Sequence, residues 1–420
     1  MRNPLDWSLL SGGLPVALTI LGIAALALLV FRAGLRIVLP AALGSAAVAV
    51  AVKYIVDRVW RPFPDPLPWA VVLWIGVLLL ALTIAAARRR MLPLLAVVPV
   101  LALCALQINS FFAYYPTSRA ALGLQTRTSP LPPGGRPLVT APPGTALADV
   151  WQAPAGLPAR GSLSSVAIPG TVSGFRARPG LVYVPPAYLT EPRAQLPVLI
   201  LLAGQPGEPM NWITSGQVPA MIDAFAAAHR GLAPIVVIPD DLGSTLANPL
   251  CVDSKLGNVE TYLKTDVPQW IAGNLQSAGV KAIGGFSHGG TCALQLAVRA
   301  PDVYPVFLDI SGQREPTLGS RAETVARAFG GDAAAFAAVN PLDVLKTKQF
   351  TASAGTFVVG SGDHEYLPQM REAFAAAKAA GMDVRFQELP GGHDWSVWHP
   401  ALERNLPWLA GRSGITRATP

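Results

Sequence analysis

Four long apolar runs with almost no charge occupy the first 115 residues. They are LPVALTILGIAALALLVF (14–31), LRIVLPAALGSAAVAVAV (35–52), WAVVLWIGVLLLALTIAAA (69–87) and MLPLLAVVPVLALCALQI (91–108). Each approaches the roughly 20 residues, at about 1.5 Å rise per residue, that a helix needs to cross the hydrocarbon core of a bilayer. We therefore expect a membrane region over 1–115 with four transmembrane helices. A cleavable signal peptide is not expected, because no small-residue cleavage site follows the first run.

The pattern changes twice after the apolar runs. Residues 116–160 are dense in Pro, Gly and small polar residues and show no sustained hydrophobic period. That composition cannot bury a core, so it predicts an extended linker. Over 161–412, short apolar runs alternate with helical segments, and residues 413–420 are predicted to form a flexible tail.

Seven apolar runs in the segment 161–412 are strand candidates, and several are apolar throughout rather than alternating. They cover 180–186, 196–204, 233–240, 281–287, 304–312, 355–362 and 383–392. Continuously apolar strands are typical of a sheet that is covered on both faces. Regular alternation of strand and helix predicts an α/β domain with a mostly parallel central sheet.

Charge is distributed unevenly along the chain. The mean hydropathy is +0.41 and the formal net charge is +7. Residues 1–90 hold nine Lys or Arg against three Asp, which leaves 23 basic and 22 acidic side chains in the rest of the chain. The basicity is therefore a signal of membrane flanks, and a nucleic-acid partner is not expected.

The same flanks predict an orientation. If the loops after the first and third apolar runs are cytoplasmic, they carry five arginines, including Arg88, Arg89 and Arg90, against four basic residues on the opposite side, among them Arg2. Positive charge favours the cytoplasmic side. An even number of spans places both termini on one side, so the segment after residue 115 is expected outside the cytoplasm.

Three cysteines occur in the chain. Cys104 lies in the fourth apolar run, where a packing role is expected. Cys251 and Cys292 lie in the α/β segment, and an extracytoplasmic location would permit a disulfide between them. Two separate buried thiols are the alternative.

The stretch KAIGGFSHGG (281–290) carries the first candidate for catalysis. Ser287 lies between Gly285 and Gly289, after an apolar strand candidate and before the amphipathic segment TCALQLAVRA. Strand, tight turn and helix are the context of a nucleophile elbow, whose crowded backbone favours glycine on both sides of the serine.

A serine nucleophile needs a base and an orienting carboxylate, which in this fold class follow in the order Ser, Asp or Glu, His. Asp363 comes just after the strand candidate TFVVGSG, and His393 just after FQELPGG. Order and placement therefore predict a triad of Ser287, Asp363 and His393.

Other residues compete for these roles. Glu365 is the alternative acid, although Asp363 lies nearer the strand end. As bases, His364 has the wrong chain order and His399 is expected in the following helix.

The tetrahedral intermediate of ester chemistry also needs two backbone N–H donors. We expect one from His288, which follows the nucleophile. The second is expected from Gln205, after the strand candidate LPVLILLAG.

Over residues 162–410 the chain resembles the esterase D superfamily of α/β hydrolases, and within it the secreted mycolyltransferases. The resemblance rests on LLAGQPG, on GGFSHGG and above all on PGGHDWSVWHPAL, where His393, Trp395 and Trp398 match the family's His-x-Trp-x-x-Trp ending. It implies an α/β-hydrolase fold, with Ser287 as nucleophile and His393 as base. In the segment CVDSKLGNVETYLKTDVPQWI, Asp266 is expected to be structural.

Departures from the mycolyltransferases limit what the resemblance implies. Those enzymes use a glutamate as acid, carry an arginine in the loop that reads QPGEPMNW here, and lack the four-helix membrane part. We therefore expect a membrane-anchored serine esterase or acyltransferase that acts on a small-molecule or lipid ester in or near the cell envelope, and not specifically a sugar acyltransferase. No cofactor or metal is expected for this chemistry. The alternative is an inactive hydrolase-like scaffold or binding module.

Overall fold

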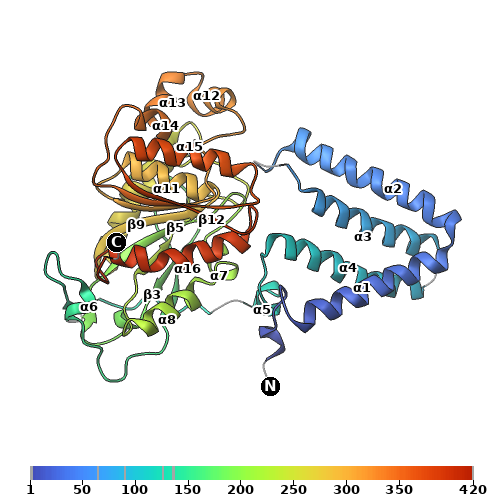
Figure 1. Cartoon of the computed structure of the whole chain (residues 1–420), viewed down its shortest axis with the longest axis horizontal. Coiled ribbons are helices and arrows are strands. Elements are labelled where there is room, and N and C mark those ends of the chain that lie inside the picture. Colours follow the sequence, from blue (N-terminus) through green and yellow to red (C-terminus); the bar gives the residue numbers. More distant parts are fainter. Residues whose placement is uncertain (1–2, 64–65, 89–90, 125–126, 135–137, 419–420) are drawn as a thin grey trace. The chain divides into compact units, whose positions relative to one another are not determined.

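The computed structural model describes residues 3–63, 66–88, 91–124, 127–134 and 138–418. Arg2, Arg89 and Arg90 of the predicted membrane flanks lie outside the described residues. The chain divides into two compact units, Met1–Gln125 and Thr126–Pro420 (Figure 1).

The first unit is helical. Its long helices are α1 (Gly13–Ala33), α2 (Leu35–Tyr54, continued by a π-helical segment Ile55–Trp60), α3 (Trp69–Ala87) and α4 (Met91–Phe112). A short 3₁₀ helix (Pro4–Asp6) precedes them and α5 (Ser118–Ala121) follows. Within the described residues, four helices are long and apolar enough to cross a membrane, as the hydrophobic pattern predicted.

Close helix packing holds the first unit together. α1 packs against α4, and α3 packs against both α2 and α4. A Cβ on Gly22 would lie 2.4 Å from the Cβ of Leu103, so glycine is what lets α1 approach α4. Outward-facing side chains such as Phe31 and Leu43 are apolar and exposed, and a lipid environment would bury them.

The second unit is built on a mixed sheet. Among the described residues it has eight strands in the order β12-β11-β10-β9-β5-β6-β3-β2. The strands are β2 (Ser162–Val166), β3 (Gly180–Val184), β5 (Leu196–Leu202), β6 (Ile235–Ile238), β9 (Ser277–Phe286), β10 (Val306–Ile310), β11 (Ala354–Gly360) and β12 (Asp383–Leu389). The six strands from β12 to β6 are parallel, whereas β3 is antiparallel to both β6 and β2.

Helices cover both faces of this sheet, with α11 (His288–Arg299) and α15 (Tyr366–Ala379) on one face and α8 (Val218–Ala228) and α16 (Trp395–Arg412) on the other (Figure 1). The remaining elements are β1 (Leu138–Val139), α6 (Leu147–Val150), a 3₁₀ helix (Pro186–Tyr188), β4 (Arg193–Ala194), α7 (Asn211–Thr214), β7 (Asp253–Ser254), β8 (Gly257–Asn258), α9 (Val259–Thr261), a π-helical segment (Tyr262–Asp266), α10 (Val267–Asn274), α12 (Arg321–Phe329), α13 (Ala333–Val339) and α14 (Pro341–Leu345).

The seven predicted strands are all present and the α/β class is confirmed. The edge strand β2 was missed because its sequence, SLSSV, is largely polar.

Parts of the segments predicted as an extended linker and a flexible tail pack against the sheet domain. Trp151 is 1% exposed, and its Nε1 donates a hydrogen bond to the carbonyl of Arg230 at 2.9 Å. The backbone N–H of Leu147 bonds to the carbonyl of Gly414, and Ile415 is fully buried. A segment too polar to form its own core is thus ordered because its few large apolar side chains bury against the sheet domain.

Candidate active site

Ser287 occupies a sharp turn between β9 and α11. Its backbone has φ 54° and ψ −120°, and its N–H bonds to the carbonyl of Ile310 at 2.8 Å. A Cβ on Gly285 would lie 2.3 Å from the backbone of Gly289, and a Cβ on Gly289 would lie 2.4 Å from the carbonyl oxygen of Leu202. Both glycines are therefore sterically required, as expected for a nucleophile elbow.

The structure brings the three predicted side chains together. His393 Nε2 lies 2.9 Å from Ser287 Oγ, and His393 Nδ1 lies 2.8 Å from Asp363 Oδ2. The other oxygen of Asp363 accepts the backbone N–H of Tyr366 at 3.1 Å. These contacts form one hydrogen-bonded series from a buried carboxylate, through a partly exposed imidazole, to the hydroxyl.

The competing residues lie elsewhere. Glu365 and His364 are exposed, and Glu365 Oε1 accepts a hydrogen bond from Gln369 at 3.4 Å. His399 lies in α16, where its Nδ1 is 2.9 Å from the carbonyl oxygen of Gly216. Among the predicted acids and bases, the geometry therefore favours Asp363 and His393.

The predicted oxyanion residues lie on either side of the serine. His288 is the first residue of α11, where helical N–H groups have no intrahelical acceptor. Gln205 follows Gly204, whose added Cβ would lie 3.2 Å from Ser287 Cβ, so this loop runs directly past the nucleophile. The side chain of Gln205 donates to the carbonyl of Leu246 at 3.0 Å.

A partly buried ion pair that the sequence did not reveal anchors the loop after β5. Arg178 Nη2 lies 2.7 Å from the fully buried Asp240 Oδ1 and donates to the carbonyl of Gly207 at 2.9 Å. Arg178 and Asp240 are 62 residues apart in the chain, so no local pattern could have indicated their pairing.

Aromatic rings surround the histidine. Tyr366 stacks on His393 with ring centroids 3.9 Å apart, and Trp398 meets the same imidazole edge-on at 5.1 Å. Phe286, next to the serine, stacks on Trp398 at 4.5 Å and contacts Trp395 at 4.6 Å. Trp398 thus packs between the imidazole and the elbow strand, and Trp395 packs beside it against Phe286.

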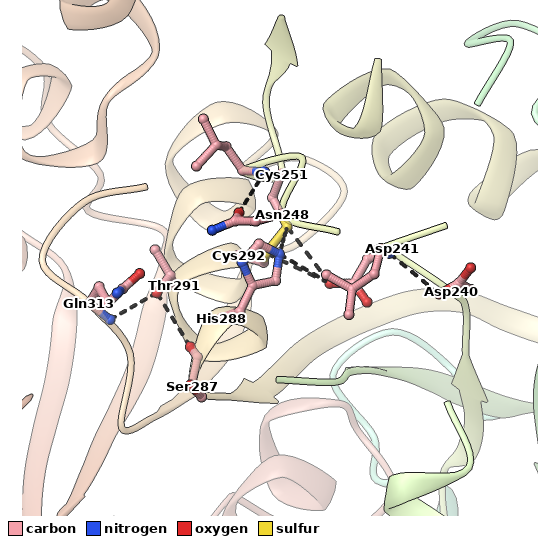
Figure 2. The surroundings of a disulfide bond; sticks show 11 residues. Asp240, Asp241, Asn248, Cys251, Ser287, His288, Thr291, Cys292 and Gln313 are labelled. Atoms are coloured by element: carbon pink, nitrogen blue, oxygen red, sulfur yellow. Dashed lines mark hydrogen bonds and ion pairs between the residues drawn. A yellow bond between two sulfur atoms is a disulfide. The ribbon is translucent and has the colours of Figure 1, made fainter. Parts of the chain in front are cut away.

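A second polar cluster lies at the start of α11 (Figure 2). Cys251 and Cys292 form a disulfide, the first of the two arrangements that the sequence allowed. Beside it lie Asp241 and His288, with His288 Nε2 3.6 Å from Asp241 Oδ2. Burial lowers the pKa of His288 to about 4, while burial and the neighbouring Asp240 raise the pKa of Asp241 well above its usual value. In the described part of the chain, these four residues are a group whose donor atoms could hold a metal ion.

Asp266 has the structural surroundings expected from its segment. Its carboxylate accepts hydrogen bonds from the N–H groups of Val172 and Ser173 and from the hydroxyl of Thr171, at 2.7–3.0 Å. Burial acts to raise the pKa of Asp266, but the combined effect of these hydrogen bonds is larger and the pKa is lowered.

Sheet order, elbow and the Ser–His–Asp contacts together define an α/β hydrolase of the serine-hydrolase class. The Putative esterase family matches residues 175–409, and the chain belongs to this family. The sequence-based identification as an esterase-type α/β hydrolase is thereby confirmed.

Similar proteins agree with this class. An uncharacterized protein of Corynebacterium glutamicum is 38% identical over 394 residues, which cover 90% of each chain. A ferulic acid esterase structure has a TM-score of 0.52 at 20% identity and covers 60% of this chain and 98% of its own. The structure of an S-formylglutathione hydrolase from Agrobacterium tumefaciens has a TM-score of 0.50 at 19% identity and covers 60% of this chain and 95% of its own. At these identities the two structures support the shared fold.

Proposed function

We propose that the protein is a membrane-anchored serine esterase or acyltransferase that works through an acyl-enzyme on Ser287. The observation that carries the proposal is the continuous contact from Asp363 through His393 to Ser287, with both nitrogens of one imidazole engaged at 2.8 and 2.9 Å. A serine hydroxyl becomes a useful nucleophile only when such a base accepts its proton.

In the acylation step, Ser287 Oγ attacks the ester carbonyl while His393 Nε2 accepts the hydroxyl proton. His393 then donates this proton to the departing alcohol, which leaves the acyl group on the serine. Asp363 accepts the Nδ1–H of the imidazole, which holds the tautomer and stabilises the imidazolium that forms between the two transfers.

Negative charge on the carbonyl oxygen requires donors that are in place before the reaction. We assign these to the backbone N–H groups of His288 and Gln205. The ion pair of Arg178 with Asp240 supports this assignment, because it holds the carbonyl of Gly207 in the same loop as Gln205. Water, or the hydroxyl of a second substrate, then attacks the acyl-enzyme with His393 again as the base.

The four apolar helices support a location in the membrane. An anchored esterase meets substrates in or near the bilayer, so we propose an acylated lipid or glycolipid of the cell envelope as the ester. The arginine-rich loop after α3 favours a cytoplasmic location for that loop and an extracytoplasmic one for the hydrolase unit.

The nucleophile can be tested with a fluorophosphonate probe on the full chain in detergent micelles, read by intact mass. We expect one adduct on the parent protein and none on Ser287→Ala. Ser361→Ala is a matched control, because Ser361 is an exposed serine two residues before Asp363 and should leave labelling unchanged.

The absence of an adduct on folded parent protein would instead favour the inactive scaffold. Hydrolysis and transfer are separated by offering the acylated protein water alone or water with glycerol or a sugar. Release of free acid in both cases indicates an esterase, whereas appearance of the acylated alcohol indicates an acyltransferase.

A further inference from the structure

Four potential metal ligands converge beside the nucleophile, outside the proposed triad. Asp241 follows β6, Cys251 lies in the loop before β7, and His288 and Cys292 are one turn apart on the same face of α11. Figure 2 shows the imidazole of His288 directed at the disulfide and at Asp241. Three separate parts of the chain thus place their donor atoms around one point.

The distances between these atoms match those around a tetrahedral ion. Bonds of about 2.0–2.3 Å to nitrogen, oxygen and sulfur place neighbouring ligand atoms about 3.3–3.8 Å apart. Cys251 Sγ lies 3.4 Å from His288 Nε2 and 3.8 Å from Asp241 Oδ2. Asp241 Oδ2 is 3.9 Å from Cys292 Sγ and 3.6 Å from His288 Nε2. Two sulfur atoms that are bonded to each other cannot both bind an ion at the centre, so the disulfide must be reduced first.

The surroundings of Asp241 also suit a cation. The residue is 1% exposed, and in the described part of the chain its Oδ1 has no hydrogen-bond partner. Its Oδ2 faces two sulfur atoms that carry no proton while they are bonded to each other. The backbone N–H of Ala203 favours the ionised form, but a buried carboxylate with one oxygen left unpartnered remains costly unless a cation or proton compensates it.

We propose that Asp241, Cys251, His288 and Cys292 form a zinc-type metal site when the Cys251–Cys292 disulfide is reduced. A dithiol reductant supplies two electrons and two protons, so that the disulfide becomes two thiols and the reductant becomes a cyclic disulfide. As the ion binds, the two thiols lose their protons to water, as does the Asp241 carboxyl where it is protonated. Disulfide and metal are then alternative cross-links at one place.

The composition of the site defines its role. All four positions of a tetrahedral ion are occupied by protein, so no position remains for an activated water, and the site is of the structural kind. The ion would connect the 241–251 segment to the first turn of α11, which begins immediately after Ser287. This inference goes beyond the proposed ester chemistry and does not depend on it.

The site can be tested with Co²⁺ as a spectroscopic probe on the full chain in detergent. The protein is reduced with dithiothreitol without oxygen, freed of reductant and titrated with Co²⁺. We expect one equivalent to bind with thiolate-to-cobalt charge-transfer absorption and the visible bands of a tetrahedral ion, and Zn²⁺ to displace it. The oxidised protein should show neither signal.

Variants assign the ligands. Cys104→Ser removes a cysteine of α4 outside the cluster and should bind as the parent does. The double variant Cys251→Ser/Cys292→Ser should lose the charge-transfer absorption. Asp241→Asn keeps the disulfide for folding and should weaken Co²⁺ binding to the reduced protein by at least about 10-fold.

Three results would overturn the proposal. They are equal Co²⁺ binding by the reduced parent and the double variant, equal binding by reduced parent and Asp241→Asn, or loss of circular dichroism on reduction that Co²⁺ does not restore. None of these readouts uses ester turnover, so the site can fail while the proposed function stands.

Discussion

Two histidines lie beside Ser287, and each has a carboxylate next to it. His393 contacts Asp363 at 2.8 Å and the serine hydroxyl at 2.9 Å. His288 contacts Asp241 at 3.6 Å, but its Nε2 faces Cys251 at 3.4 Å instead of the serine. The same two residue types therefore occur on both sides of the elbow in different surroundings.

Exposure separates the two surroundings. The His393 side chain is 21% exposed, whereas the His288 side chain is 8% exposed and burial lowers its pKa to about 4. An imidazole with so low a pKa is a poor proton acceptor near neutral pH, but its neutral form is the one that binds metals. A histidine beside a carboxylate is thus not by itself a catalytic pair, because access to the nucleophile and to substrate decides its chemistry.

The largest expected effect concerns the base. His393→Ala should lower the turnover of a chromogenic ester by about 10⁴-fold or more, because the serine loses its proton acceptor. His399→Ala is the matched control in α16 and should retain most of the parent turnover. If His393→Ala turned over ester as fast as the parent, the distinction between the two histidines would disappear.

The acid should follow with a smaller effect. We expect Asp363→Asn to reduce turnover by about 10²–10⁴-fold, because an amide cannot stabilise the imidazolium and favours the wrong tautomer. Glu365→Gln, two residues away and exposed, should change little. The reverse ranking in the same turnover assay would assign the acid to Glu365.

Substituting a glycine tests whether the turn at Ser287, which lies next to both histidines, needs a residue without a side chain. Gly289→Ala should lower the free energy of unfolding by about 1–3 kcal/mol, because the new Cβ would overlap the carbonyl oxygens of Leu202 and Ala203. Gly273→Ala in α10 meets no atom within 4 Å and should be neutral or stabilise by about 0.5–1 kcal/mol. Thermal unfolding of both variants in detergent measures the difference, and equal melting temperatures would contradict it.

A different effect, on how stability varies with pH, is expected from a buried carboxyl that has no histidine beside it. Asp309 is fully buried on β10, and its Oδ1 accepts the N–H of Gly312 at 3.0 Å. Burial raises the pKa of Asp309 to about 8, although this hydrogen bond opposes the change. Between about pH 4 and about pH 8 the folded state therefore holds one more proton than the unfolded state, and stability falls as pH rises through that window.

Asp309→Asn removes this dependence, because an amide does not ionise. The free energy of unfolding of Asp309→Asn minus that of the parent should rise from about pH 5 to about pH 8, by up to about 1.4 kcal/mol per pH unit, and then level off. Melting temperatures of the two proteins across this pH range follow the difference. Asp302→Asn makes the same change at an exposed carboxylate and is the control for the substitution itself. Parallel curves for the Asp309→Asn variant and the parent would show that Asp309 does not bind this proton.

Local signals in the sequence were sufficient for much of the fold and for the three side chains of the proposed triad. Apolar runs long enough for a bilayer, strands apolar throughout and the glycines around Ser287 each reflect forces that act within about 20 residues. The chain order Ser, Asp, His then placed Asp363 and His393 after strands that proved parallel and adjacent. For these features a local pattern is enough, because each element must satisfy its own backbone and bury its own face.

Contacts between distant residues were decided only by the tertiary structure. Trp151 orders a segment whose composition predicted no structure, because the domain offers it a surface on which to bury. Arg178 forms an ion pair with Asp240, 62 residues away in the chain, and Cys292 forms a disulfide with Cys251, 41 residues away. His288 was predicted for its backbone N–H, yet its imidazole turns toward Asp241 and the disulfide. The direction of a side chain and its desolvation depend on all the elements packed around it, and so no pattern along the chain records them.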